Sequence, residues 1–405
     1  MCIRDRLLSL AQRNGVLEEM IQLLDTNRAQ LISANKKDLD AFDPNDRAMY
    51  DRLIINDYKI DGMITAVKDI HADADPIGVS RYNWTHPNGM EVQNKTAPFG
   101  TIMIIYESRP DVTIEAAVVA FKSNNRILLK GGKEAKHSNQ ALVELWHKAL
   151  GATGLSKDWI TFLQLSRQET QEYLKNPPVK MDLIVPRGGE GLINYVKSHA
   201  SCPVLVSGRG NNFMYIHDDA NQEMAQELII QSKVQKISAC NALDKVLINQ
   251  NIGDIKTFLT SLTDTLKAQN VEVLITEEVD KLLSPNDYMV VMDENVWYEE
   301  FLAMRIVVGL VRGIEQATGL INEYSGGHSV SIVSEDKAQA SRFMDAIDAA
   351  AVYHNASTRF TDGGQMGVGA ELAISTDKLH HRGPLGLHQL VTNKWYVFGS
   401  GHTRQ

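Results

Sequence analysis

The chain has 405 residues, of which 43% are apolar, 22% are charged and 7% are aromatic. A chain of this length and composition can bury the cores of two or three domains, which excludes a disordered protein. Asp and Glu number 50 and Lys and Arg number 41, so the net charge is -9, which argues against a surface that follows nucleic-acid phosphates. No apolar run approaches the roughly 18 residues of a membrane span. We therefore expect a cytoplasmic protein that acts on small molecules, with no nucleic-acid or membrane partner.

The predicted elements begin with helices and a hairpin. Met1 to Arg6 show neither helical periodicity nor a capping residue, and we expect them to be disordered or foreign to the natural start. From Leu7 to about Phe42, apolar residues recur at helical spacing, which predicts two or more amphipathic helices. The polar run from Arg81 to Lys95 centres on Asn88-Gly89, a pair that tolerates the positive φ values of a type I′ turn. This run predicts a β-hairpin, which has too little core to stand alone and is expected to dock on another subunit.

Beyond the hairpin, short apolar runs alternate with helical stretches. This alternation is typical of βαβ units and of a parallel sheet covered on both faces. A first series extends from Gly100 to His199, and a second begins after Cys240 and extends to His354. The sequence therefore predicts two α/β domains.

Two turns between a strand and a helix carry groups that suit a dinucleotide. Gly188 and Gly189 follow an apolar strand, and such a turn lets the amides of a helix start approach a diphosphate. The second turn runs from Lys130 to Lys133, where two ammonium groups at a helix start suit a phosphate. An ordinary glycine turn and ordinary surface lysines are the alternatives for these two patterns.

The thiols and imidazoles show no metal-binding pattern. The three cysteines are Cys2, Cys202 and Cys240. Their odd number and wide spacing fit neither a disulfide framework nor a zinc site, which predicts free thiols. The twelve histidines include neither an HExxH motif nor an i, i+4 pair with a third ligand, so we expect no metal site.

Cys240 is the cysteine with a candidate catalytic position. It lies between a helical stretch and the strand Lys245 to Ile248, where a loop between domains would place its side chain in a cleft. A free cysteine is more often a buried apolar residue than a nucleophile, but the polar neighbours Ser238 and Asn241 moderate that preference. Cys202 opens an apolar strand and fits a packing role.

The most unusual run follows the apolar strand that ends near Tyr353. It spans 355–371 and gathers hydroxyl, amide, guanidinium and glycine groups. The candidate substrate-binding residues in it are Asn355, Ser357, Thr358, Arg359 and Thr361. Together they could hold a carboxylate, with Arg359 supplying a bidentate fork. A glycine-rich surface loop is the alternative interpretation.

Taken together, these segments resemble the gamma-glutamyl phosphate reductases, a family of the aldehyde dehydrogenase superfamily. The matching motifs, between about Leu17 and Gly401, are Ile105-Tyr-Glu-Ser-Arg-Pro-Asp-Val-Thr, Leu129-Lys-Gly-Gly-Lys-Glu-Ala, Val185-Pro-Arg-Gly-Gly-Glu-Gly-Leu-Ile, Cys240-Asn-Ala, Asn355-Ala-Ser-Thr-Arg-Phe-Thr-Asp-Gly-Gly and Lys378-Leu-His-His-Arg-Gly-Pro-Leu-Gly-Leu.

The resemblance implies an aldehyde dehydrogenase-like α/β fold in three parts. Residues 1–80 and 96–236 would form a cofactor-binding domain, and 237–375 a catalytic domain. Residues 81–95 and 385–405 would form a small β element for oligomerisation, so a homo-oligomer is implied.

The resemblance also implies a reaction, the NADPH-dependent reduction of gamma-glutamyl phosphate to glutamate 5-semialdehyde in proline biosynthesis. Cys240 is the expected nucleophile and would form a thioester after expelling phosphate. Its backbone N–H and Ser108 fall where the superfamily places oxyanion donors. Glu300 falls where the superfamily places a glutamate on the nicotinamide ribose. Lys130 and Lys133 would lie near the adenosine ribose, where a 2′-phosphate would favour NADP(H).

The sequence departs from the family pattern beside the expected active site. The run expected as Asn-Ala-Lys-x-Gln-Arg-Pro-Ser-x-Cys reads Gln231-Ser-Lys-Val-Gln-Lys-Ile-Ser-Ala-Cys240, and a Cys-His pair is replaced within Asn212-Phe213-Met214. These changes bear on substrate positioning and rate. The stretch Val204 to Asn212 lacks the glutamate base of hydrolytic aldehyde dehydrogenases, which favours phosphate over water as the leaving and attacking group.

Two other functions stay open at this point. An aldehyde dehydrogenase of another substrate is disfavoured by the missing base. A scaffold of the same fold that has lost its activity is disfavoured by the retained Cys240 and by the intact run Asn355 to Gly364. A glutamate kinase that hands over its unstable product would be a natural partner.

Overall fold

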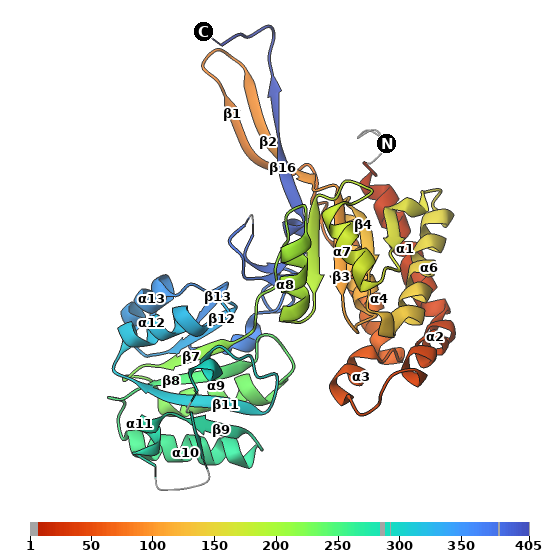
Figure 1. The fold of residues 1–405 in the computed structure, drawn as a ribbon. Helices are drawn as coiled ribbons and strands as arrows, with labels where there is room; N and C mark the ends of the chain where they lie inside the picture. The colour runs from red at the N-terminus through yellow and green to blue at the C-terminus, as the bar shows by residue number, and fades with distance from the viewer. Residues whose placement is uncertain (1–6, 284–287, 292, 380, 405) are drawn as a thin grey trace. The chain divides into compact units, whose positions relative to one another are not determined.

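The computed structural model describes residues 7–283, 288–291, 293–379 and 381–404. The expectation for Met1 to Arg6 lies outside the described residues. The chain divides into two compact units (Figure 1). Unit 1 comprises Met1–Ser207, Gly367–Ala373 and Leu379–Gln405, and unit 2 comprises Gly208–Met366 and Ile374–Lys378.

Unit 1 contains a four-stranded parallel sheet. Its order is β5 (Ile160–Phe162), β4 (Arg126–Lys130), β3 (Thr101–Tyr106) and β6 (Leu183–Arg187). The chain adds β4 and β5 on one side of β3 and then returns to place β6 on the other side. Open α/β sheets bind ligands beyond the carboxyl ends of the strands where the order reverses in this way. The reversal therefore marks the ends of β3 and β6 as a binding position.

Helices cover both faces of this sheet. They are α1 (Leu10–Thr26), α2 (Arg28–Asp40), α3 (Arg47–Leu53), α4 (Asp57–Ala72), α5 (Val112–Lys122), α6 (Lys136–Ala152), α7 (Arg167–Lys175) and α8 (Glu190–His199), with short 3-10 helices η2 (Lys133–Ala135) and η3 (Lys157–Trp159). Because successive side chains of a strand point to opposite faces, Ile102 and Ile104 pack with α1, α4, α5 and α6, whereas Met103 and Ile105 pack on the side of α7 and α8. The predicted helical N-terminal layer is present as α1 and α2, and α1 begins in a capping box between Ser9 and Gln12.

The predicted hairpin forms part of a three-stranded antiparallel sheet. Its order is β1 (Ser80–Thr85), β2 (Glu91–Pro98) and β16 (Val391–Phe398), so segments about 300 residues apart in sequence lie side by side (Figure 1). Gly89 has φ +92° in the turn, which a glycine adopts without strain. Every residue of β1 is exposed, including Tyr82 and Trp84. A sheet with exposed aromatic side chains fits the expected interface between subunits.

Unit 2 contains a seven-stranded parallel sheet. Its order is β10 (Met289–Val290), β9 (Glu272–Ile275), β11 (Arg305–Val311), β8 (Leu243–Asn249), β7 (Asn212–Ile216), β12 (Ser329–Val333) and β13 (Ala351–His354). The helices are α9 (Gln222–Val234), α10 (Ile255–Ala268), α11 (Glu277–Asp280), α12 (Ile314–Tyr324) and α13 (Lys337–Ala346). Met214 and Val246 pack on the face covered by α9 and α10, and Phe213 and Leu247 on the face of α12 and α13. The expectation of parallel sheets covered on both faces is confirmed.

The remaining elements are short: η4 (Glu294–Trp297), η5 (Thr358–Phe360), β14 (Ala373–Ser375), β15 (Gly383–Leu385) and η6 (Leu387–Gln389). No helix in the described part of the chain is both long enough and apolar enough to span a membrane.

The division between the two units lies after Ser207, earlier than the boundary expected at 236/237. Residues 208–236 form β7 and α9, and β7 pairs with β8 on one side and β12 on the other. Because a central strand is inseparable from its sheet, this segment belongs with the unit that contains Cys240. The departure from the family pattern within 212–214, where a Cys-His pair is expected, therefore lies in that same unit.

Candidate active site

Cys240 lies in a tight turn between α9 and β8, at the amino-terminal edge of the seven-stranded sheet. The side-chain amide of Asn212, at the start of β7, donates to the backbone carbonyl of Cys240 at 2.8 Å and to that of Ala242 at 2.6 Å. Gly210 packs against the same carbonyl so closely that any β-carbon there would overlap it. Gly210 and Asn212 thus fix the backbone of the turn, while Cys240 itself stays partly exposed.

Asn241 ties this turn to the loop that follows β13. Its amide nitrogen donates to the backbone carbonyls of Arg359 at 3.1 Å and Thr361 at 3.0 Å. In return, the hydroxyl of Thr358 donates to the backbone carbonyl of Asn241 at 2.8 Å. The two runs that the sequence singled out separately are therefore held together by reciprocal hydrogen bonds.

Four of the five predicted substrate-binding side chains are engaged by the protein itself. Asn355 has φ +52° and pairs through its amide with both the N–H and the C=O of Ser334 at 3.0 Å. The Ser357 and Ser232 hydroxyls lie 2.6 Å apart. Thr358 holds Asn241, as described above. These contacts show how the loop is shaped, and they occupy the groups that the sequence suggested for a ligand.

Thr361 belongs to a buried chain of hydrogen bonds. Its hydroxyl lies 2.6 Å from that of Ser329 and 2.7 Å from that of Tyr353. The Ser329 hydroxyl lies 2.7 Å from Nδ1 of His328, whose side chain is fully buried. Burial lowers the pKa of His328 to about 4, so the imidazole is neutral at pH 7. The chain links β12, β13 and the loop that carries Arg359.

Arg359 differs from its neighbours. Among the residues that the structure describes, its Nε and Nη1 atoms are buried without a hydrogen-bond partner. Burial lowers the pKa of Arg359, while the charges of Cys240 and Asp362 act in the opposite direction. The side chain as a whole is half-buried, but two buried N–H groups without a partner are costly, and a carboxylate or phosphate that accepts from both nitrogens would relieve that cost.

Glu300 lies at the same amino-terminal edge of the sheet as the Cys240 turn, in the loop between η4 and β11. The backbone on either side of it is anchored, because the Lys245 ammonium donates to the Glu299 carbonyl and the Phe301 N–H donates to the Asp244 carboxylate. Both anchors lie at the start of β8, a few residues after Cys240.

Unit 1 contains a cavity of about 1220 Å³ beyond the carboxyl ends of its strands. Ile105 and Tyr106 line it at the end of β3, Lys130 at the end of β4 and Gly191 after β6. Lys133 also lines it, together with other basic side chains that include Lys136 and Arg167. The position agrees with the reversal of strand order at β3 and β6.

The two glycine-containing turns differ, because Lys130, Gly132 and Lys133 line this cavity whereas Gly188 and Gly189 do not. Lys130 is half-buried, and burial lowers its pKa while Glu134 and Glu107 oppose that shift. In the other turn, the N–H of Gly189 donates to a carboxylate oxygen of Glu107 at 3.1 Å, and a β-carbon at Gly188 would overlap that carboxylate. An anionic group of the protein itself thus lies on the helix-start amide where the sequence suggested a diphosphate.

Ser108, the expected oxyanion donor, lies in unit 1 just after β3 and is buried. Its hydroxyl donates to Glu134 at 2.7 Å and its backbone N–H donates to the same oxygen at 2.8 Å. The hydroxyl is therefore committed to Glu134 in this structure. Cys202, for which we expected a packing role, is partly buried against the apolar residues under α7 and α8, and burial raises its pKa.

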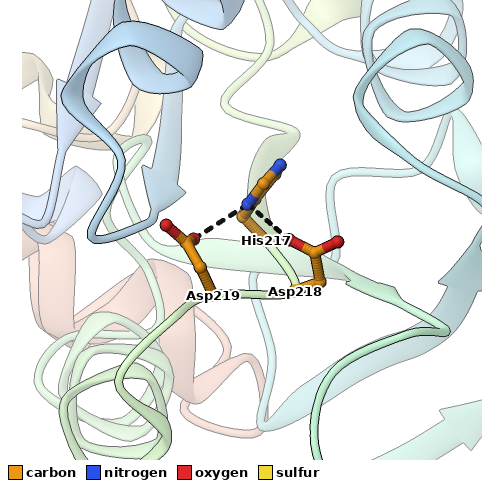
Figure 2. A group of neighbouring side chains, drawn as sticks. All are labelled: His217, Asp218 and Asp219. Atoms are coloured by element: carbon orange, nitrogen blue, oxygen red, sulfur yellow. Dashed lines mark hydrogen bonds and ion pairs between the residues drawn. The ribbon is translucent and has the colours of Figure 1, made fainter.

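One group of neighbouring side chains resembles a set of metal ligands. His217, Asp218 and Asp219 follow β7, and Nδ1 of His217 lies 2.9 Å and 2.8 Å from oxygens of the two carboxylates (Figure 2). Asp219 also accepts hydrogen bonds from the hydroxyl of Ser334 and the N–H of Asp336, where α13 begins. These contacts account for the cluster as a structural link between β7 and the start of α13.

Comparisons with known proteins agree with this architecture. The model of the aldehyde dehydrogenase family matches residues 6–281, more than half of the chain. The chain belongs to the aldehyde dehydrogenase family.

Full-length relatives narrow the comparison within the family. The chain is 39% identical to a gamma-glutamyl phosphate reductase from Aquifex aeolicus over 98% of this chain and 92% of that protein. It is 38% identical to a gamma-glutamyl phosphate reductase from Geobacillus kaustophilus over 98% and 95% of the two chains. The crystal structure of the gamma-glutamyl phosphate reductase from Thermotoga maritima matches 99% of this chain and 96% of its own, with a TM-score of 0.94 and 37% identity.

Sequence reasoning missed the residues that fix the Cys240 turn. The sequence marks Asn212 only as a departure from the family pattern and indicates no role for Gly210 or Asn241. One signal was available, since Gly210-Asn-Asn212 places two amides at the start of an apolar strand, where unpaired polar groups are unfavourable. The partners of Asn212 at Cys240 and Ser329, 28 and 117 residues away in the chain, have no such signal.

Proposed function

We propose that this chain reduces gamma-glutamyl phosphate to glutamate 5-semialdehyde with NADPH, releasing phosphate, as a step of proline biosynthesis. Cys240 is the nucleophile, and the 355–361 loop holds the substrate. The similarity to gamma-glutamyl phosphate reductases over nearly the whole chain supports this assignment. The observation that carries it is the half-buried side chain of Arg359 beside the Cys240 turn, whose Nε and Nη1 atoms have no hydrogen-bond partner among the described residues.

The chemistry follows from the thiol. The Cys240 sulfur attacks the acyl carbon, a C–S bond forms, and the bond from carbon to the phosphate oxygen breaks, with phosphate leaving with the electron pair. The backbone N–H of Cys240 stabilises the tetrahedral oxyanion, and Ser108 is the proposed second donor once its hydroxyl leaves Glu134. NADPH, when bound, supplies the hydride that converts the thioester to the aldehyde and frees the thiol.

The residues of unit 1 fit such a cofactor. A cavity of about 1220 Å³ carries Lys130 and Lys133 on its wall, and ammonium groups match a ribose 2′-phosphate. Gly188 and Gly189 are the proposed diphosphate turn, where the cofactor would have to replace the Glu107 carboxylate on the Gly189 N–H. Glu300 is the proposed partner of the nicotinamide ribose. Of these groups, Lys130 and Lys133 are the ones that make NADP(H) the preferred cofactor over NAD(H).

Residues 204–212 correspond to the stretch in which hydrolytic aldehyde dehydrogenases carry their glutamate base. Their composition favours phosphate over water as the group that attacks the thioester. Residues 204–212 contain no carboxylate. Arg209 in this stretch donates instead to the backbone carbonyl of Tyr298 at 2.8 Å. The lack of a carboxylate in this stretch disfavours hydrolysis of the thioester and favours phosphate as its partner in the reverse direction.

The surroundings of the enzyme follow from the same assignment. The exposed aromatic residues of the β1, β2 and β16 sheet form the contact between copies of the chain, giving a homo-oligomer. The enzyme acts in the cytoplasm, and a glutamate kinase that produces the unstable acyl phosphate is its proposed partner.

An assay in the reverse direction tests the proposal. Purified protein should reduce NADP⁺ with glutamate 5-semialdehyde when phosphate is present and should lose most of this activity when phosphate is omitted. Cys240→Ala should abolish the reaction while leaving the circular dichroism spectrum unchanged, and Cys202→Ala is the matched control that keeps it. Phosphate-independent aldehyde oxidation, or a Cys240→Ala protein that retains more than a few per cent of the rate, would overturn the assignment.

A further inference from the structure

A cluster of buried charges that the proposed reaction does not use lies at the start of β8. Lys233, at the end of α9, and the consecutive residues Asp244 and Lys245 are 0%, 2% and 0% exposed. Lys233 pairs with Asp244 at 2.9 Å. The cluster thus buries two lysine side chains with one aspartate. Burying charge is costly, and apolar side chains of similar size are often as stable, so the cluster calls for a role besides stability.

The role is visible in what these residues hold. Nζ of Lys245 donates to the backbone carbonyl of Glu299 at 2.8 Å. The second carboxylate oxygen of Asp244 accepts from the backbone N–H of Phe301 at 3.3 Å. The residue between these two anchored groups is Glu300. Consecutive residues of one buried strand therefore hold the backbone on both sides of Glu300.

The ring of Phe301 completes the anchor. Its centroid lies 3.7 Å from Nζ of Lys245 and 5.9 Å from that of Lys233, and the guanidinium of Arg305 lies 5.7 Å away. A cation over an aromatic face is attracted by the ring and gains more when water is excluded. Phe301 is 9% exposed, so the ring excludes water from the two ammonium groups. The Phe301 side chain is held by the same charges that hold its backbone.

Lys245 is the member of the cluster with the least electrostatic compensation. Burial lowers its pKa to about 7, although the charge of Asp244 opposes the shift. Its ammonium nonetheless donates to a backbone carbonyl beside Glu300, where a methionine, an unbranched apolar side chain one atom shorter, would fill most of the space without donating. The start of β8 follows the Cys240 turn directly, so one rigid segment carries both the nucleophile and the anchors of the Glu300 loop.

We propose that Lys245 and Asp244 are positioning residues that fix the Glu300 backbone for contact with the nicotinamide ribose. The inference rests on the proposed function, because Glu300 has its role only if a nicotinamide cofactor binds. In this proposal, Lys245 and Asp244 affect the affinity for the cofactor through the position of Glu300, without contacting the cofactor themselves.

The test measures binding of NADP⁺ by calorimetry, apart from turnover. Lys245→Met should raise the dissociation constant about tenfold, the effect of losing one charge-assisted hydrogen bond, while the melting temperature stays equal or rises. Lys245→Gln, which keeps an N–H donor on a shorter neutral side chain, should recover part of the affinity. Lys122→Met is the matched control, because Lys122 is equally buried and donates to Asn14 and His71 in unit 1. It should leave the dissociation constant unchanged.

A double-mutant cycle with Glu300→Gln separates the possible outcomes. If Lys245 acts through Glu300, adding Lys245→Met to Glu300→Gln should cost little further affinity. Additive losses, or an unchanged dissociation constant in Lys245→Met while Glu300→Gln weakens binding, would overturn the positioning role alone. An unchanged dissociation constant in Glu300→Gln would overturn the role of Glu300 itself and the inference with it. Neither result would touch the proposed nucleophile, which the phosphate-dependent assay of Cys240→Ala examines separately.

Discussion

The α-carbon of Gly210 lies directly against the backbone carbonyl of Cys240. The contact crosses from the segment that enters β7 to the turn that enters β8, and the amide of Asn212 donates to the same carbonyl. The orientation of the Cys240 turn is therefore set by a close backbone approach that any side chain at position 210 would block.

In Gly210→Ala, the added β-carbon would push the Cys240 turn away from its present position. We expect kcat to fall by about 10- to 100-fold, because even a small displacement of the sulfur misaligns its attack on the acyl carbon. The affinity for NADP⁺ should change little. Gly151→Ala is the control, since a β-carbon at that helical position meets no other atom within 4 Å. A Gly210→Ala enzyme with wild-type kcat in steady-state kinetics would show that the turn adapts without cost.

Lys133→Ala should reduce the preference for NADPH over NADH. A charge-assisted contact to the 2′-phosphate is worth about 1.5–3 kcal/mol, which is roughly ten- to a hundredfold in affinity. The measurement is kcat/KM with each cofactor, and only the NADPH value should fall. Lys157→Ala, an exposed lysine that does not line the cavity, should leave the ratio unchanged. An unchanged ratio in Lys133→Ala would remove that lysine from the cofactor site.

The buried His328 should make the protein sensitive to acid. Burial lowers its folded pKa to about 4, below the value of about 6.5 that it has when unfolded, so the unfolded chain binds more protons between these values. The free energy of unfolding should therefore fall as the pH drops from 6.5 to 4, by up to about 3 kcal/mol, and be unaffected above 6.5. Urea titrations across this range should show a flatter profile for His328→Asn. The exposed His402, replaced in the same way, provides the control.

Much of the fold was predictable because its signals are local. Apolar runs of strand length alternate with amphipathic helices, and this fixed the expectation of parallel sheets. The Asn88-Gly89 pair marked the hairpin, since a turn with positive φ leaves a signature in the residues that form it. Cys240 stood out as a free thiol with small, polar neighbours.

The support around Cys240 was not predictable, because it depends on contacts between distant segments. Asn241 and Thr361 are 120 residues apart in the chain, and Asn212 and Ser329 are 117 apart. The position of Cys240 just before a strand places it at the amino-terminal edge of its sheet, opposite to the usual position of ligands in open α/β sheets, but the sequence does not show which other segments reach that edge. The parallel pairing of β7 with both β8 and β12 brings Asn212, the Cys240 turn and Ser329 to the same edge of the sheet.

The last prediction concerns Arg359. The substrate carries a free α-carboxylate several bonds from its reacting carbon, and holding that far end positions the carbon over the thiol. Within the loop, Asn355, Ser357, Thr358 and Thr361 already bond to the protein, whereas Nε and Nη1 of Arg359 are buried without a partner among the described residues.

Arg359→Ala should therefore lower kcat/KM for glutamate 5-semialdehyde by two or more orders of magnitude, since a buried charge-paired contact is worth about 2–5 kcal/mol. An aldehyde of similar length without the α-carboxylate has no such contact to lose, so the variant should discriminate less between the two substrates. Arg342→Ala, which removes an exposed ion pair with Glu315, is the control and should leave both values unchanged. If both substrates lost activity equally, Arg359 would instead support the Cys240 turn, and His381 or Arg382 would be the next candidates for the α-carboxylate.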